Sequence, residues 1–279
     1  MSEYRVVVSA ENNPFMAWQC KLFHFSCVSR LRLTPTFIVH ESGKDWHPDF
    51  RDIVRAGGIV RHAPSYALTP QGQRYSPRNT PGTLLHAAEL YRGTDDLIVL
   101  CDPDMLFVNE PKFPRMLSGE YYPYMRYDQE AVQTARQKLG VAACEIESRG
   151  SELCLGVPHV VPSADAQRLA ETWLEAIDAF PPVLWEISMY ALGLAAVKLK
   201  MRIELTYMLG FSHRMDAPIV WDMIHYCYGD ERWSKHHFHY DEQARAVWKP
   251  QVDAPGGTVL GEILAQLREA GEFYGRFTF

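Results

Sequence analysis

Short apolar runs rich in β-branched residues alternate along the first hundred residues with segments whose apolar side chains recur at helical spacing. We expect strands at residues 5–9, 36–39, 59–61 and 97–101, and helices at residues 14–28, 49–56 and 81–91. Asn13 should cap the first helix, with Pro14 in its first turn. Strands that alternate with helices predict a mostly parallel central sheet covered on both faces. Ligands of such sheets bind beyond the carboxyl ends of the strands.

The second half of the chain has a less regular pattern. A helix is expected at residues 164–180, where Leu169, Trp173 and Ile177 share one face and Pro181 ends the helix. Further helices are expected at residues 185–199 and 257–271, and an aromatic strand at residues 218–226. Because no repeat, low-complexity segment or clear linker divides the 279 residues, we expect a single domain.

Composition narrows the class of protein. The 28 basic and 34 acidic residues give a formal charge of −6, and the absence of a long basic run argues against nucleic-acid binding. No signal peptide is visible, and no apolar run reaches the ~18 residues of a membrane helix. We therefore expect a cytoplasmic protein with no membrane segment. The six cysteines lack CxxC spacing, which favours reduced thiols and argues against zinc.

An acidic pair follows the most apolar strand of the chain. Asp102 and Asp104, separated by Pro103, leave the strand at the sheet edge where ligands bind. Two carboxylates suit Mg²⁺ or Mn²⁺, which commonly bridges protein oxygens and phosphate oxygens. A divalent cation about 4 Å from one unit of charge on a departing diphosphate contributes roughly 8 kcal/mol at an effective dielectric near 20. The alternative is an ordinary acidic turn.

Two later residues can extend this site. His225 offers a neutral imidazole as a third ligand, and a nitrogen ligand among oxygens favours Mn²⁺ over Mg²⁺. Lys235 can neutralise phosphate oxygens as a mobile positive charge. Taken alone, His225 is more typical of a core histidine than of a metal ligand, and His236, His237 and His239 are more typical of a polar loop than of a metal cluster.

Several stretches, colinear along most of the chain, together resemble one family. That family is the plant hydroxyproline O-arabinosyltransferases and peptidyl-serine α-galactosyltransferases. The stretches are Ser-Ala-Glu-Asn-Asn at 9–13 with Trp-Gln-Cys at 18–20, Ser-Pro-Arg-Asn-Thr-Pro at 76–81 continuing through Leu85 and His86 into the acidic pair and Met105, Tyr-Asp at 127–128, Leu-Gly-Val at 155–157 with the Leu169–Trp173 helix, Trp185 with Met189 and Tyr190, and His225 with Trp233 and Lys235.

The resemblance implies an A-type glycosyltransferase fold, a uridine-diphosphate (UDP) sugar donor and retention of anomeric configuration. It implies a nucleotide-binding half over about residues 1–105 and an acceptor-binding half with a closing helix over about residues 106–279. By matching positions, Asp102, Asp104 and His225 are metal ligands and Lys235 contacts the diphosphate. The other residues expected at the donor or nucleotide are Ser9, Glu11, Gln19, Arg78, Asn79 and Gly156. Asp128 and Glu186, with Gly156, are expected to hold the transferred sugar or the acceptor.

The sequence departs from the family pattern at two positions. Thr80 replaces a usual lysine, and Ser188 replaces a glutamate usual before Met-Tyr. Glu186 is a possible substitute, on another face of the helix. The sugar and the hydroxyl acceptor, whether peptide serine or hydroxyproline, a small molecule or a glycan, therefore stay open. Trp185 and Tyr190 can stack on a sugar or pack in the core.

The expected chemistry is transfer to a hydroxyl group on the face that UDP leaves. A donor phosphate oxygen can accept the acceptor proton, so that positioning and electrostatics carry the catalysis. An inverting outcome stays open if Glu186 reaches the acceptor. Two other classes of protein compete with this reading. A haloacid-dehalogenase-type phosphatase would use Asp102 as its nucleophile, and a sugar-nucleotide-binding relative would keep the fold without turnover.

Overall fold

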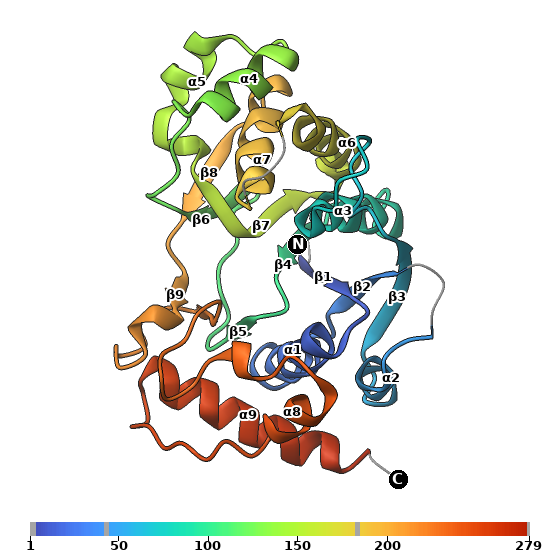
Figure 1. The fold of residues 1–279 in the computed structure, drawn as a ribbon, viewed down its shortest axis with the longest axis vertical. Coiled ribbons are helices and arrows are strands. Elements are labelled where there is room, and N and C mark those ends of the chain that lie inside the picture. Colours follow the sequence, from blue (N-terminus) through green and yellow to red (C-terminus); the bar gives the residue numbers. More distant parts are fainter. Residues whose placement is uncertain (1–3, 42–44, 182–184, 278–279) are drawn as a thin grey trace. The chain divides into compact units, whose positions relative to one another are not determined.

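The computed structural model describes residues 4–41, 45–181 and 185–277, and Figure 1 shows their helices and strands. The main sheet has seven strands in the order β3-β2-β1-β4-β7-β6-β8. Their bounds are β1 (Tyr4–Glu11), β2 (Thr36–Glu41), β3 (Ile59–Pro64), β4 (Leu97–Cys101), β6 (Leu117–Tyr121), β7 (Leu155–Pro162) and β8 (Ile203–Thr206). The four strands expected in the first hundred residues are all present, and the mixed α/β class with helices flanking a central sheet is confirmed.

The sheet is mixed because β7 runs against its neighbours. β1 pairs with β4 in parallel, with Val8 opposite Cys101. β7 is antiparallel to both β4 and β6, whereas β6 and β8 are parallel. A second sheet of three strands has the order β5-β10-β9, with β5 at Met105–Phe107, β10 at Met223–His225 and β9 at Leu209–Phe211. It places a segment that directly follows the acidic pair beside one from the last quarter of the chain.

The predicted helices are present with shifted ends. Their bounds, with those of the helices that the pattern did not predict, are α1 (Pro14–Ser26), α2 (Pro48–Arg55), α3 (Asn79–Leu90), α4 (Glu130–Lys138), α5 (Ala143–Arg149), α6 (Ser163–Ala179), α7 (Ile187–Lys198), α8 (Asp241–Ala246) and α9 (Val259–Gly275). Asn13 caps α1 as expected, because its side chain accepts a hydrogen bond from Met16 N at 2.9 Å. The aromatic strand expected at residues 218–226 was too long. Only Met223–His225 is a strand, since β5 offers three residues to pair with it.

The described residues divide into two compact units by their contacts. The first unit draws on the described residues within 1–9, 63–101 and 113–207, and the second on those within 10–62, 102–112 and 208–279. Trp173 is completely buried in the first unit, as are Trp18 and Phe23 of α1 in the second. No described helix has the length and apolar character that a membrane crossing requires, and the six cysteines are free thiols.

Two buried histidines make the stability of the fold sensitive to acid. Burial lowers the pKa of His24 to about 4 and that of His159 to about 3. Both values lie below the ordinary 6.5, so the unfolded chain takes up protons first as the pH falls. Their contribution to stability is therefore complete above pH ~6.5 and is lost progressively below it.

We expect the free energy of unfolding to fall by a few kcal/mol, up to about 3 per histidine, between pH 7 and pH 4. Urea unfolding at several pH values measures this slope. Replacing His159 by Phe should flatten it, whereas replacing the exposed His213 by Gln should leave it unchanged. A slope that is identical in His159→Phe and wild type would contradict this origin.

Candidate functional site

The acidic pair and His225 are brought together by one short antiparallel ladder. β5 begins immediately after Asp104, and His225 of β10 lies opposite Met105 in the register. The ladder continues where the amide of Tyr226 donates to the carbonyl of Asp104 at 2.9 Å. The Tyr226 hydroxyl donates to the carbonyl of Pro103 at 3.3 Å. The backbone of the acidic turn is therefore fixed by the two residues His225 and Tyr226 from a distant part of the sequence.

The side chains of this cluster converge. His225 Nε2 lies 3.2 Å from Asp104 Oδ1 and 4.0 Å from Asp102 Oδ2. The candidate ligand atoms of Asp102, Asp104 and His225 all lie within 4.8 Å of one another. The Lys235 ammonium forms an ion pair with the other carboxylate oxygen of Asp104. The side chains of Asp104 and His225 are buried, whereas that of Asp102 is 33% exposed, so Asp102 is the most accessible member of the acidic pair.

The charges of the cluster shift its pKa values in opposite directions. Burial, together with the charge of Asp104, raises the pKa of Asp102 to about 6. Burial also opposes ionisation of Asp104, but the ammonium of Lys235 and the imidazole of His225 outweigh it and hold the pKa of Asp104 well below its usual range. Burial would lower the pKa values of His225 and Lys235, yet the Asp104 carboxylate raises both. Asp104 therefore stays ionised, and Asp102 is the carboxylate that exchanges a proton near neutrality.

The donor atoms fit a small divalent cation. Two ligands at about 2.1 Å from one ion are at most about 4.2 Å apart. Both distances that involve His225, 3.2 and 4.0 Å, meet this limit. The remaining separation is at most 4.8 Å, so the carboxylates need to approach by no more than about 0.6 Å. Two oxygens and one imidazole nitrogen suit Mn²⁺ better than an all-oxygen site would.

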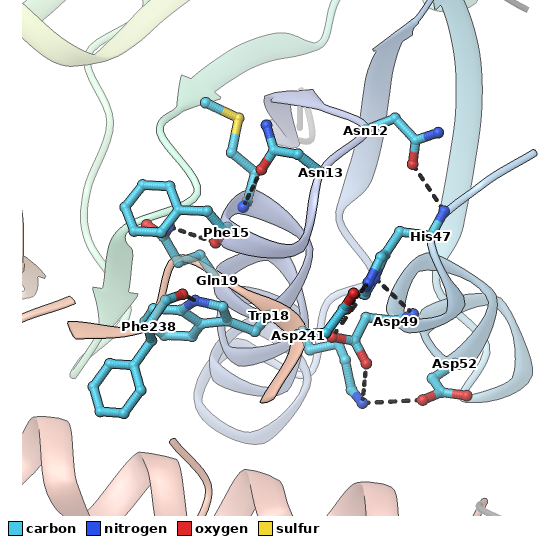
Figure 2. A network of polar contacts seen from close by, with 12 residues as sticks. Asn12, Asn13, Phe15, Trp18, Gln19, His47, Asp49, Asp52, Phe238 and Asp241 are labelled. Atoms are coloured by element: carbon cyan, nitrogen blue, oxygen red, sulfur yellow. Dashed lines mark hydrogen bonds and ion pairs between the residues drawn. The ribbon is translucent and has the colours of Figure 1, made fainter. Parts of the chain in front are cut away.

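Lys235 is carried by a loop that is fastened to α1. The loop (residues 234–239) contains a short 3₁₀ helix, Lys235–His237, which Ser234 caps through its side chain. The indole of Trp18 donates to the carbonyl of Phe238 at 3.0 Å, as Figure 2 shows. Phe15 stacks on His239 with ring centroids 4.3 Å apart. The two contacts with α1 hold the end of the loop that follows Lys235 and thereby limit the positions that the Lys235 side chain can take.

Three of the predicted nucleotide-site residues lie in β1 and α1. Gln19 is buried, and its amide donates to the carbonyl of Phe15 at 2.6 Å. Glu11 ends β1 and is half-buried, with its backbone amide directed at the sulfur of Met16. Ser9 is buried near the end of β1 and belongs to the first unit. The nucleotide role of all three stays a prediction.

Arg78 and Asn79, both in the first unit, are engaged in holding the segment before α3. The Arg78 guanidinium forms a two-pronged ion pair with Asp178 at 2.9 and 2.8 Å. It also donates to the carbonyls of Tyr66 and Leu68. Asn79 is buried, and its side-chain oxygen accepts from the amide of Tyr66 at 2.8 Å. Both residues therefore have a structural role. Their contact with the donor stays a prediction.

Three further candidates lie in the first unit. Gly156 is in β7, where an added Cβ would lie 2.4 Å from the ring of Tyr122, so only glycine fits there. Asp128 is exposed in the turn that precedes α4. Glu186 is half-buried at the N-terminus of α7, and its carbonyl accepts from the amides of Met189 and Tyr190. None of these contacts assigns a substrate role.

The residues that support the cluster have no distinctive signal in the sequence. Trp18 has the helical spacing of a core residue and is in fact buried, so nothing in the pattern indicated its hydrogen bond to residue 238. Tyr226 was read as part of an aromatic strand, without a link to the acidic turn. Cys20 is a buried thiol whose pKa is raised by burial and by the nearby charge of Asp104. Such partners are distant in sequence and are found only when the chain is folded.

Comparison with known proteins identifies the fold. No protein-family model and no curated protein matches the chain. Among solved structures, the galactosyltransferase LgtC with donor and acceptor sugar analogues is 13% identical, with a TM-score of 0.48 over 90% of this chain and 98% of its own. An active-site variant of LgtC is 12% identical, with a TM-score of 0.52 over 95% of each chain. The bifunctional glycosyltransferase WbbM is 11% identical, with a TM-score of 0.50 over 95% of this chain and 52% of its own. The likeness to the LgtC variant and WbbM shows that the chain has the A-type glycosyltransferase fold.

Metal binding at this cluster should depend on pH. Mn²⁺ must displace the proton of Asp102, whose pKa is raised to about 6, and any proton on His225. We expect the affinity for Mn²⁺ to be at least about fourfold lower at pH 5.5 than at pH 7.5, because most Asp102 side chains are protonated at the lower pH. This affinity is measured at each pH by following the signal of free Mn²⁺ in electron paramagnetic resonance during a titration. Equal affinity at both pH values would show that this carboxylate is not a ligand.

The fastening of the loop to α1 can be tested without any substrate. Replacing Trp18 by Phe keeps a large ring but removes the indole donor to Phe238. Loss of one buried hydrogen bond, about 1 kcal/mol, should raise amide hydrogen exchange in residues 235–240 about fivefold. The matched control is Trp46→Phe, which removes an indole donor to His62 and should leave this exchange unchanged. No change in Trp18→Phe would refute the fastening.

Proposed function

We propose that the chain is a divalent-cation-dependent glycosyltransferase that moves a sugar from a UDP-sugar to a hydroxyl acceptor, with retention of configuration. The observation that carries the proposal is the convergence of Asp102, Asp104 and His225 beside Lys235, in a chain with the A-type glycosyltransferase fold. The fold alone is compatible with many activities. The cluster adds the donor set that a cation holding a diphosphate requires.

Each residue of the cluster has a separate task in this proposal. Asp102, Asp104 and His225 would hold Mn²⁺ or Mg²⁺, which when bound supplies positive charge to the diphosphate of the donor. Asp104 is suited to be the permanent anion, because its two oxygens face His225 and Lys235 and it remains ionised. Lys235 can exchange its contact with Asp104 for one with a phosphate oxygen, since its ammonium is held at the edge of the cluster by the loop on α1.

In this proposal the acceptor attacks from the face that UDP leaves, and the anomeric configuration is therefore retained. A donor phosphate oxygen would take the acceptor hydroxyl proton as UDP leaves, so that no protein base is needed. The protein then contributes position and a fixed electrostatic field. Ser9, Glu11, Gln19, Arg78 and Asn79 are assigned to the nucleotide or donor. Asp128, Gly156 and Glu186 are assigned to the transferred sugar or acceptor.

The deciding experiment is release of UDP from a panel of UDP-sugars in the presence of Mn²⁺. Replacing Asp104 by Ala should reduce release by about a thousandfold, because even half of the cation's stabilisation of the leaving group corresponds to that factor. Asp102→Asn should lose activity similarly and is less disruptive to folding, since Asp102 is more exposed. The control Asp253→Asn alters a fully exposed carboxylate and should be fully active.

Three outcomes would count against the proposal. Absence of a calorimetric signal with UDP and Mn²⁺ would contradict the proposed nucleotide site. A trapped phosphoaspartate at Asp102 would instead indicate a phosphatase. Metal-dependent UDP binding without turnover of any UDP-sugar in the panel would indicate a binding relative. The anomeric configuration of the product, read by nuclear magnetic resonance, separates the retaining from the inverting outcome.

A further inference from the structure

The two oxygens of the Asp104 carboxylate are both engaged by side chains of the cluster. His225 Nε2 lies 3.2 Å from Oδ1, and the Lys235 ammonium pairs with Oδ2. A divalent cation held by Asp102, Asp104 and His225 would therefore share the Asp104 carboxylate with Lys235. All four residues lie in the second compact unit, so their distances are those within one unit.

The ammonium of Lys235 has little access to water. The side chain of Lys235 is 13% exposed, and that of Asp104 is 7% exposed. Of the carboxylates in the described parts of the chain, only that of Asp104 lies within ion-pair distance of this ammonium. The centroid of the Phe15 ring lies 5.7 Å from Nζ, and Trp18 ties the backbone that follows Lys235 to α1 through the carbonyl of Phe238 (Figure 2). Lys235 therefore cannot readily exchange Asp104 for solvent.

The balance of charge determines how Lys235 responds to a metal ion. A divalent cation would neutralise the carboxylates of Asp102 and Asp104, and the ammonium of Lys235 would then lack a negative partner. Neighbouring positive charges repel each other, and an unpaired ammonium removed from water is unfavourable. Binding of the metal ion alone is therefore opposed by Lys235.

An anionic diphosphate removes this opposition. Its oxygens can bind the cation and can also accept hydrogen bonds from the ammonium of Lys235, which has three donors. The residue that disfavours the metal ion alone thus favours the metal ion and the diphosphate together. Because coupling between two ligands is reciprocal, the metal ion should raise the affinity for the diphosphate by the same factor.

We infer that Lys235 makes the cluster selective for a metal ion together with a diphosphate over the metal ion alone, because its ammonium competes with the ion for Asp104. The inference goes beyond the assignment of Lys235 as a phosphate contact, and it rests on the proposed function for the identity of the anion. The competition for Asp104 involves only the chain and the metal ion, so it can be tested without a nucleotide.

The first test measures the affinity for Mn²⁺ at pH 7.5 without nucleotide, from the electron paramagnetic resonance signal of the free ion. Lys235→Met removes the charge from a side chain of similar length and should bind Mn²⁺ at least about tenfold more tightly than wild type. Lys235→Gln should show the same gain, whereas Lys235→Arg keeps the charge and should stay within about threefold of wild type. The control Lys249→Met removes the charge of an exposed lysine in the same unit and should not alter the affinity.

A double variant locates the gain in affinity. Asp102→Asn combined with Lys235→Met should abolish the gain, because the ion then lacks one of its carboxylate ligands. A gain that persists in the double variant would arise outside the cluster and would overturn the inference.

The second test measures the affinities for UDP and for inorganic pyrophosphate by calorimetry, at low and at saturating Mn²⁺. Mn²⁺ should strengthen the binding of both anions to wild type. The factor of strengthening should be at least about tenfold smaller in Lys235→Met, because this variant admits the ion without a diphosphate. An equal factor in Lys235→Met and wild type would overturn the selectivity.

The two tests separate this inference from the proposed function. If Lys235→Met binds Mn²⁺ no more tightly than wild type but UDP-sugars release UDP, the inference fails and the proposed function stands. If the gain in Mn²⁺ affinity and the coupling to pyrophosphate are both found but no UDP-sugar is turned over, the inference stands and the proposed function fails.

Discussion

The pairing of three residues of β5 with three residues of β10 is the constraint on which the candidate site depends. It fixes His225 opposite Met105 and allows the amide of Tyr226 to donate to the carbonyl of Asp104. Residues more than a hundred positions apart in the sequence are thereby adjacent. In this arrangement His225 Nε2 lies 3.2 Å from Asp104 Oδ1 and 4.0 Å from Asp102 Oδ2. A shift of the ladder by one residue would turn His225 to the opposite face of the small sheet.

The electrostatics of the cluster follow from this enforced proximity. Two carboxylates close together and partly removed from water cannot both be ionised at low cost, and Lys235 and His225 stabilise one of them in particular. Asp104 becomes the fixed anion, whereas Asp102 has its pKa raised to about 6 and is the more exposed of the two. The loop that carries Lys235 is itself held by Trp18 and Phe15. The site thus combines a firmly held backbone with one carboxylate, Asp102, whose protonation can change when a ligand binds.

In the first unit, several polar side chains hold the backbone of neighbouring segments. The Trp173 indole donates to the carbonyl of Ser188, and the Tyr75 hydroxyl accepts from the Ser188 amide. The Arg78 guanidinium pairs with Asp178 and donates to two backbone carbonyls. The rings of Trp185 and Tyr124, in the same unit, are exposed.

The sequence by itself determined the elements whose signals are local. The apolar runs located β1 to β4, Asn13 and Pro14 located the start of α1, and the position of Asp102 and Asp104 after β4 marked the acidic turn as a candidate metal site. The antiparallel insertion of β7 and the short length of β10 were decided by pairing partners, because a strand's direction and length depend on its neighbours. The link from Trp18 to residue 238, the burial of Tyr190 and the exposure of Trp185 were likewise decided only by tertiary structure. Periodicity reports which side of an element is apolar, whereas contacts between distant residues arise from the way the chain packs.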